Sequence, residues 1–140
     1  MSARPGLSMP KILYTQDYNR NDYDPAMPVL AIGLSRPGRP TAATIIEALV
    51  DSGSDGTLIP LDILEAADAP YVDSAYIRGV TGHREPVDLY LITVHIGTHQ
   101  IHGVRAAALP VSQEAILGRN VLNQLNVMLN GVAGVTEILE

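Results

Sequence analysis

The sequence predicts a single, mostly β domain, built as a barrel or sandwich with one or two small helices. The chain has 140 residues, of which 46% are hydrophobic, enough for one domain with its own core. From Pro28 onward, short β-branched runs alternate with turns that contain Gly or Pro, a pattern typical of all-β folds. The absence of cysteine excludes disulfides, thiol nucleophiles and cysteine-ligated metals.

Residues 1–27 differ from the rest and are interpreted as an N-terminal arm, followed by one domain over residues 28–140. Gln16–Pro25 reads QDYNRNDYDP and has neither helical nor alternating apolar spacing. We expect an arm or loop here, with its tyrosines packed on the domain.

The strands expected in the domain are short apolar runs bounded by turn residues. They cover Val29–Leu34, Thr44–Val50, Tyr76–Val80, Pro86–Ile96, His99–Leu109 and Val135–Leu139. A short helix is expected within Leu58–Ala67, because Pro60 suits a first helical turn. Ala115–Leu129 begins as a buried strand and continues with helical spacing.

Charge and hydropathy exclude several classes of partner. The net charge of −6 lacks the clustered cations that nucleic acid requires. No apolar run approaches the ~20 residues of a membrane span, and Met1–Pro10 lacks the apolar core of a signal peptide. The sequence thus favours a cytoplasmic domain without a nucleic-acid or membrane partner.

Two motifs carry the candidate chemistry. Asp51-Ser52-Gly53-Ser54 directly follows the apolar run Ile45–Val50, so a carboxylate is held at the end of a buried strand. Small residues around it let another backbone approach closely. An Asx-type turn is the structural alternative for this stretch alone. The second motif, Ala-Ile-Leu-Gly-Arg-Asn, covers Ala115–Asn120.

In this order the motifs resemble those of the retropepsins, the retroviral-type aspartic proteases. The resemblance covers about residues 28–130 and rests on three segments: Leu49-Val50-Asp51-Ser52-Gly53-Ser54-Asp55, Gly79-Val80-Thr81-Gly82 and Ile116-Leu117-Gly118-Arg119-Asn120. It implies a closed β-barrel with one short C-terminal helix, forming one half of a two-fold dimer.

The resemblance also implies roles for single residues. Asp51 is the catalytic aspartate, Gly53 supports it, and Ser52 hydrogen-bonds across the dimer. Ser54 lies beside the outer oxygen of the catalytic carboxylate, where its hydroxyl would tune the pH dependence. Asp55 and Arg119 form an ion pair near the dimer interface. The flap tip that closes over substrate comprises Gly79, Val80, Thr81 and Gly82, and the second motif contributes Ile116, Leu117, Gly118 and Asn120. Gly56 departs from the family, which more often has a larger or acidic residue there.

The chemistry accounts for the dimer. Hydrolysis of an amide by water needs a base and an acid, and two adjacent carboxylates that share one proton supply both. The chain offers a single Asp-Ser-Gly and is too short for a second homologous half. A two-fold homodimer pairs Asp51 with its symmetry mate. The expected activity is an aspartic endopeptidase acting on peptide or protein substrates, with no metal or other cofactor.

Other interpretations of the same residues fit less well. Asp51–Asp62 partly matches a calcium loop, but Gly53 and Pro60 occupy ligand positions and the final Glu is absent. His95, His99 and His102 would suggest zinc on a helix, whereas their β-branched surroundings indicate exposed positions on a hairpin. A catalytically inactive dimerisation or peptide-binding module on the same fold stays open, because a fold does not fix a function.

Overall fold

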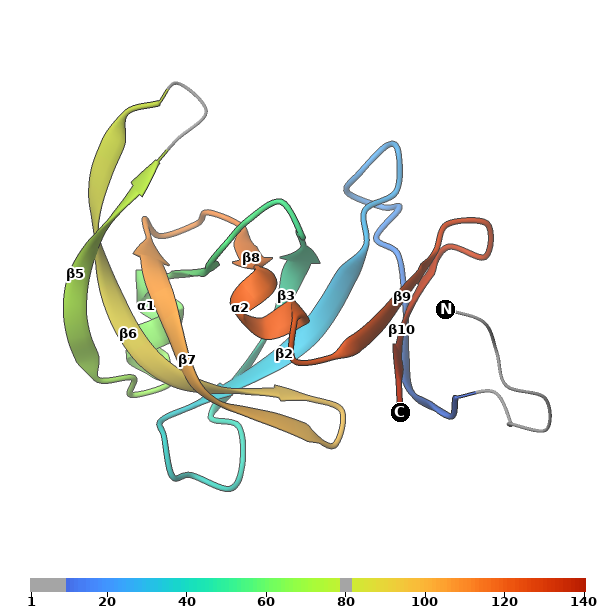
Figure 1. Ribbon diagram of the computed structural model, residues 1–140, viewed down its shortest axis with the longest axis horizontal. Coiled ribbons are helices and arrows are strands. Elements are labelled where there is room, and N and C mark those ends of the chain that lie inside the picture. Colours follow the sequence, from blue (N-terminus) through green and yellow to red (C-terminus); the bar gives the residue numbers. More distant parts are fainter. Residues whose placement is uncertain (1–9, 79–81) are drawn as a thin grey trace.

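The protein is described by a computed structural model, which covers residues 10–78 and 82–140. Within these residues it contains ten strands and two short helices (Figure 1). In chain order they are β1 (Ile12–Asp17), β2 (Val29–Ser35), β3 (Thr44–Val50), β4 (Thr57–Pro60), α1 (Leu61–Ala66), β5 (Tyr71–Arg78), β6 (Arg84–Ile96), β7 (His99–Leu109), β8 (Ala115–Leu117), α2 (Arg119–Leu122), β9 (Asn126–Asn130) and β10 (Val135–Leu139).

Six strands close into a barrel, as the sequence predicts. Their order is β2-β3-β8-β4-β7-β6, and a further pairing of β2 with β6 closes the ring. β5 pairs with the outer edge of β6, and these two strands form the long curved hairpin in Figure 1. β1, β10 and β9 form a separate three-stranded sheet.

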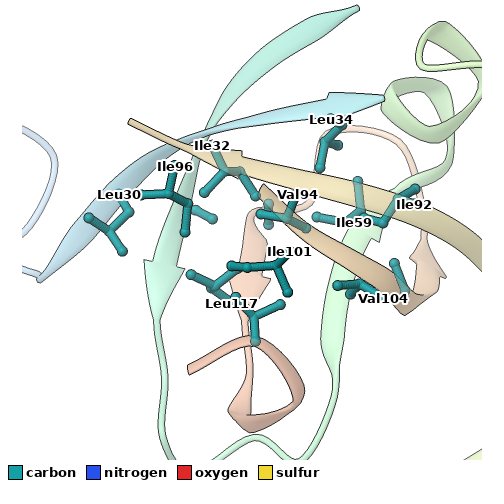
Figure 2. Close-up of a cluster of buried hydrophobic side chains, with 14 of the residues drawn as sticks. Leu30, Ile32, Leu34, Ile59, Ile92, Val94, Ile96, Ile101, Val104 and Leu117 are labelled. Atoms are coloured by element: carbon teal, nitrogen blue, oxygen red, sulfur yellow. The ribbon is translucent and has the colours of Figure 1, made fainter. Parts of the chain in front are cut away.

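The barrel core consists of aliphatic side chains that alternate along the strands. Leu30, Ile32 and Leu34 of β2 are fully buried and meet Val94 and Ile96 of β6 (Figure 2). This period-two spacing follows from the pleat, which sends every second side chain to the same face. Burial of each such side chain stabilises the fold by about 1.5–3 kcal/mol.

Most elements predicted for the domain are confirmed, with two differences. β3, β7 and β10 have the expected bounds. β5 begins at Tyr71 rather than Tyr76, because its first half is exposed and mostly polar and so lacks an apolar signal. α1 lies within Leu58–Ala67, where a short helix was expected, and β4 precedes it. The helical spacing expected as far as Leu129 yields only α2, which ends at its C-cap Asn123, and the chain from Asn126 onward forms the strand β9. Neither helix of the described residues is long and apolar enough to cross a bilayer.

The N-terminal arm contains a strand that its sequence did not predict. β1 pairs antiparallel with β10 and so covers one side of the C-terminal hairpin. Its tyrosines pack as expected, since Tyr14 lies against the core and donates a hydrogen bond to Gln16. Tyr23 bonds to the Glu114 carboxylate, and this bond, together with burial, raises the pKa of Tyr23 to about 12. The arm is therefore tied to the domain by backbone pairing and side chains.

The three histidines lie on the β6–β7 hairpin, but His95 and His99 are partly buried and only His102 of the three is exposed. His95 is partly buried, with its Nε2 atom 2.8 Å from the hydroxyl of the buried Ser35. Burial, with a smaller contribution from nearby His102, lowers the pKa of His95. A lowered pKa in the folded state means that the unfolded chain binds the proton more readily.

This difference predicts a pH-dependent stability. The contribution of neutral His95 should be complete above its unfolded pKa near 6.5 and should be lost as the pH falls through that value. The urea midpoint of the wild type should therefore fall between pH 7.5 and 5.5, and it should fall less in His95→Gln. His83→Gln changes an exposed histidine outside the strands and should keep the wild-type pH dependence. Identical pH dependence in the His95→Gln and wild-type proteins would contradict this assignment.

Candidate active site

Asp51 lies at the end of β3, in the loop that leads to β4. Its backbone N–H donates to the carbonyl of Leu117 at 3.1 Å, which extends the parallel pairing of β3 with β8 by one residue. Its carboxylate is exposed and accepts a hydrogen bond of 2.9 Å from the backbone N–H of Gly53. The carboxylate is thus oriented by its own turn while it stays open to solvent. This hydrogen bond is that of an Asx turn. The same geometry is therefore compatible with a purely structural turn and with a catalytic aspartate.

The loop crosses the end of β8. β8 lies between β3 and β4 in the barrel, so the chain must pass over the exit of β8 to go from Asp51 to Thr57. The residue after β8 is Gly118, and a Cβ atom there would overlap the carbonyl oxygen of Gly56 and lie 3.0 Å from that of Ser54. Gly118 is therefore required by the close approach of two backbones.

Thr57 joins the two motifs through its hydroxyl. The Thr57 side chain is fully buried, donates to Asn120 Oδ1 at 2.7 Å and accepts from the Gly118 N–H at 3.1 Å. The Asn120 amide in turn donates to the carbonyl of Arg105. This one buried hydroxyl thereby provides a hydrogen-bond partner to the Asn120 side chain of α2 and to the N–H of Gly118, the N-cap of that helix.

The hydroxyl of Ser54 does not bond to Asp51, which corrects the expectation from the resemblance. It donates to the carbonyl of Gly56 at 2.7 Å. This carbonyl lies against Gly118, and a partly buried acceptor is stabilised by a donor from its own loop. Ser54 therefore stabilises the turn rather than the carboxylate.

The expected ion pair between Asp55 and Arg119 is also not formed in this chain. Among the described residues, the ion pair within 4.0 Å is Arg36–Asp68, far along the sequence from this loop. Arg119 instead donates from its guanidinium to the carbonyl of Ser52 at 2.7 Å and from its backbone to the carbonyl of Ser54 at 2.8 Å. The arginine thus binds the Asp-Ser-Gly-Ser turn directly.

A cavity of about 450 Å³ opens beside this turn. It is lined by the loop from Gly53 to Leu58, by side chains of β5, β6 and β7, and by Arg119. Asp55 faces it, while the β5–β6 hairpin, which carries the expected flap at its tip, supplies part of its wall. Gly79, Val80 and Thr81 lie outside the described residues, and Gly82 is exposed with a φ of +80°.

Sequence reasoning missed Thr57, Arg84 and Arg105. The signal for Thr57 was its polar side chain at the start of the otherwise apolar run Thr57–Pro60. Arg84 and Arg105 line the cavity from β6 and β7, and only the strand pairing brings them to Asp55. Ile116 and Leu117 pair with Leu49 and Val50 at the end of β3, and Asn120 bonds to Thr57.

The chain is similar in sequence and in fold to known proteins. The family model described as aspartyl protease matches residues 42–121, which include both motifs. A retropepsin-like aspartic protease from Rickettsia conorii shares the fold with a TM-score of 0.60 and 10% identity, and the match covers 95% of each chain. The EIAV protease complexed with an inhibitor gives a TM-score of 0.52 and 19% identity, covering 70% of this chain and 86% of that one. No curated protein matches the sequence significantly.

The contact at Gly118 predicts a large effect of a single methyl group. Gly118→Ala should lower the free energy of unfolding by about 1–3 kcal/mol, because the overlap with backbone atoms cannot be relieved by a side-chain rotation. Gly131→Ala is the matched control, since nothing lies within 4 Å of its Cβ position. Chemical denaturation of both variants measures the difference, and equal stabilities would show that the close approach is not required.

Proposed function

Because the chain belongs to the aspartyl protease family and has a retropepsin-like fold, we propose that it is an endopeptidase that uses two Asp51 carboxylates, one from each subunit of a homodimer. The observation that carries this proposal is the Asp51 carboxylate itself. It is exposed, is oriented by the Gly53 N–H, and lies in the turn that borders the 450 Å³ cavity. A peptide seated in that cavity would run past the carboxylate.

The proposed reaction needs the two carboxylates in different protonation states. The charged Asp51 removes a proton from water as the water oxygen attacks the peptide carbonyl, and the protonated Asp51 of the partner subunit donates its proton to the carbonyl oxygen. In the resulting diol the roles of the pair are exchanged: Asp51, now protonated, donates its proton to the nitrogen as the C–N bond breaks, and the Asp51 carboxylate of the partner subunit takes a proton from one diol hydroxyl, which restores the starting state of the pair. The pair titrates as one unit, so neither carboxylate has a fixed role before substrate binds.

The homodimer follows from the single carboxylate and from a free strand edge. β9 pairs with β10 on one side, and in the described residues its other edge has no partner strand. Met128 and Leu129 on this strand are 43% and 50% exposed. Antiparallel pairing of β9 with the same strand of a second copy would cover this edge and join two three-stranded sheets. Ser52 would then hydrogen-bond across the two-fold axis beneath the catalytic pair.

The β5–β6 hairpin is proposed as the flap. Its strands stay in register up to the pair Arg78–Arg84, and its inner side chains already line the cavity. The proposed tip, Gly79–Gly82, would close over a bound peptide from this position.

Asp51→Asn should abolish cleavage while the fold is kept. The amide preserves the size of the side chain but cannot share a proton between subunits, so kcat should fall by at least about a thousandfold. Asp62→Asn makes the same change at an exposed position on α1 and should keep full activity. Cleavage of a peptide library by Asp51→Asn at the wild-type rate would exclude the mechanism. If the wild type binds peptides but cleaves none, the protein is instead an inactive peptide-binding module.

Charges on the edge of β9 should weaken the dimer. A protein with both Met128→Lys and Leu129→Lys brings like charges together across the two-fold axis, so the dimer Kd should rise at least about tenfold. Specific activity should fall with dilution at a correspondingly higher concentration. Ile45→Lys is the control, because Ile45 is 72% exposed at the end of β3 away from Asp51. Sedimentation velocity measures the dimer Kd of the two variants, and an unchanged Kd in the β9 variant would place the interface elsewhere.

A further inference from the structure

The cavity beside Asp51 is lined by a concentration of positive charge. Three of its lining residues are arginines, Arg84, Arg105 and Arg119, and its one acidic lining residue is Asp55. The chain as a whole carries a net charge of −6 and has nine lysines and arginines, so a third of its cations lie at this one site. If charged residues were distributed at random in this acidic chain, acidic side chains would outnumber basic ones at the cavity.

The arginines project from three different elements around an apolar floor. Leu58, Ala107, Leu89 and Ala75 come from β4, β7, β6 and β5, which are consecutive in the sheet, and they line the cavity. The small side chains of the two alanines leave room above the sheet. The charged groups therefore surround a pocket that can accept the aliphatic part of a side chain and present cations to its end.

The guanidinium groups of Arg84 and Arg105 are not neutralised by carboxylates of the described chain. The ion pair found within 4.0 Å among residues 10–78 and 82–140 joins Arg36 to Asp68, outside the cavity. The Arg84 guanidinium lies 5.9 Å from the centre of the Tyr76 ring, which holds it at the wall without using up its N–H donors. Arg119 is partly occupied by the carbonyl of Ser52. Arg84 and Arg105 are thus the groups available to a ligand.

We propose that this cavity is a specificity pocket for an acidic side chain, glutamate or aspartate, of the peptide substrate. A guanidinium can bind a carboxylate through two parallel N–H···O bonds, and the cationic surroundings disfavour lysine and arginine at the same position. The inference rests on the proposed peptidase function and adds the substrate class. Because a homodimer has two such pockets related by the two-fold axis, the preference appears at two positions, placed symmetrically about the cleaved bond.

The kinetic test uses peptides that differ only by glutamate or glutamine at one position. At low salt, kcat/KM should be roughly five- to twentyfold higher for glutamate at the two symmetric positions, mainly through KM, and the ratio should shrink at high salt. Arg105→Gln and Arg84→Gln should each reduce the ratio, while Arg105→Lys, which keeps the charge but not the paired N–H donors, should keep only part of it. Arg39→Gln removes the same charge from the exposed turn after β2 and should leave the ratio unchanged.

A binding test separates this inference from the proposed activity. The Asp51→Asn protein, which is not expected to cleave, is titrated with the same fluorescent peptide pairs, and tighter binding of the glutamate peptide supports the pocket whether or not the wild type is a protease. Equal binding and equal kcat/KM for the two peptides would overturn the inference. A glutamate preference that survives in both the Arg84→Gln and Arg105→Gln proteins would overturn its assignment to this cavity, and failure to bind any peptide would overturn it as well. Absence of cleavage by the wild type, with the binding preference intact, would reject the proposed reaction alone.

Discussion

The approach of Gly118 to the carbonyl of Gly56 determines how the two motifs can be combined in one site. β8 separates β3 from β4, so the loop that carries Asp51 has to cross the chain where it leaves β8. A side chain at Gly118 would push that loop away from the barrel. Without one, the backbone N–H of Arg119 reaches the carbonyl of Ser54, and the Asp51 N–H reaches that of Leu117. The orientation of the turn at Asp51 is thus set by backbone contacts between segments that are distant in sequence.

The buried hydroxyl of Thr57 makes this arrangement specific. A carbonyl or amide that is removed from water costs free energy unless it finds a partner, and the crossing of two loops buries several of them. The Thr57 hydroxyl accepts a hydrogen bond from the Gly118 N–H and donates one to the Asn120 side chain. The Asn120 amide donates in turn to a backbone carbonyl of β7. Ser54 and Arg119 satisfy the carbonyls of Gly56 and Ser52 in the same way. Thr57, Ser54 and Arg119 thus each supply a side-chain partner to a backbone group of the crossing loops.

The sequence predicted the parts of the molecule that depend on local pattern. β3, β7 and β10 have strong β-branched runs and were found at the expected residues, and the two motifs identified the turn at Asp51. The sequence did not predict β1 or the first half of β5, because their exposed residues carry no alternating apolar signal. It also misplaced the hydroxyl of Ser54, which bonds to the carbonyl of Gly56. That carbonyl lies against Gly118 where the loop crosses β8, and the register of strands far apart in the chain cannot be read from local spacing.

The turn at Asp51 is held rigidly, whereas the β5–β6 hairpin tolerates substitution, and this difference explains how such a fold can change its substrate specificity. The turn at Asp51 is fixed by a network that reaches β3, β8, α2 and β7, so substitutions there affect folding and chemistry together. Part of the cavity wall comes from the β5–β6 hairpin, in which β5 is an edge strand held by β6 alone. Its exposed side chains, such as Tyr76 at 68% exposure, contribute little to the core and can be exchanged at small cost. The charge of the pocket can therefore differ between chains that share the turn at Asp51, because Arg84 lies in the hairpin and outside the network that orients this turn.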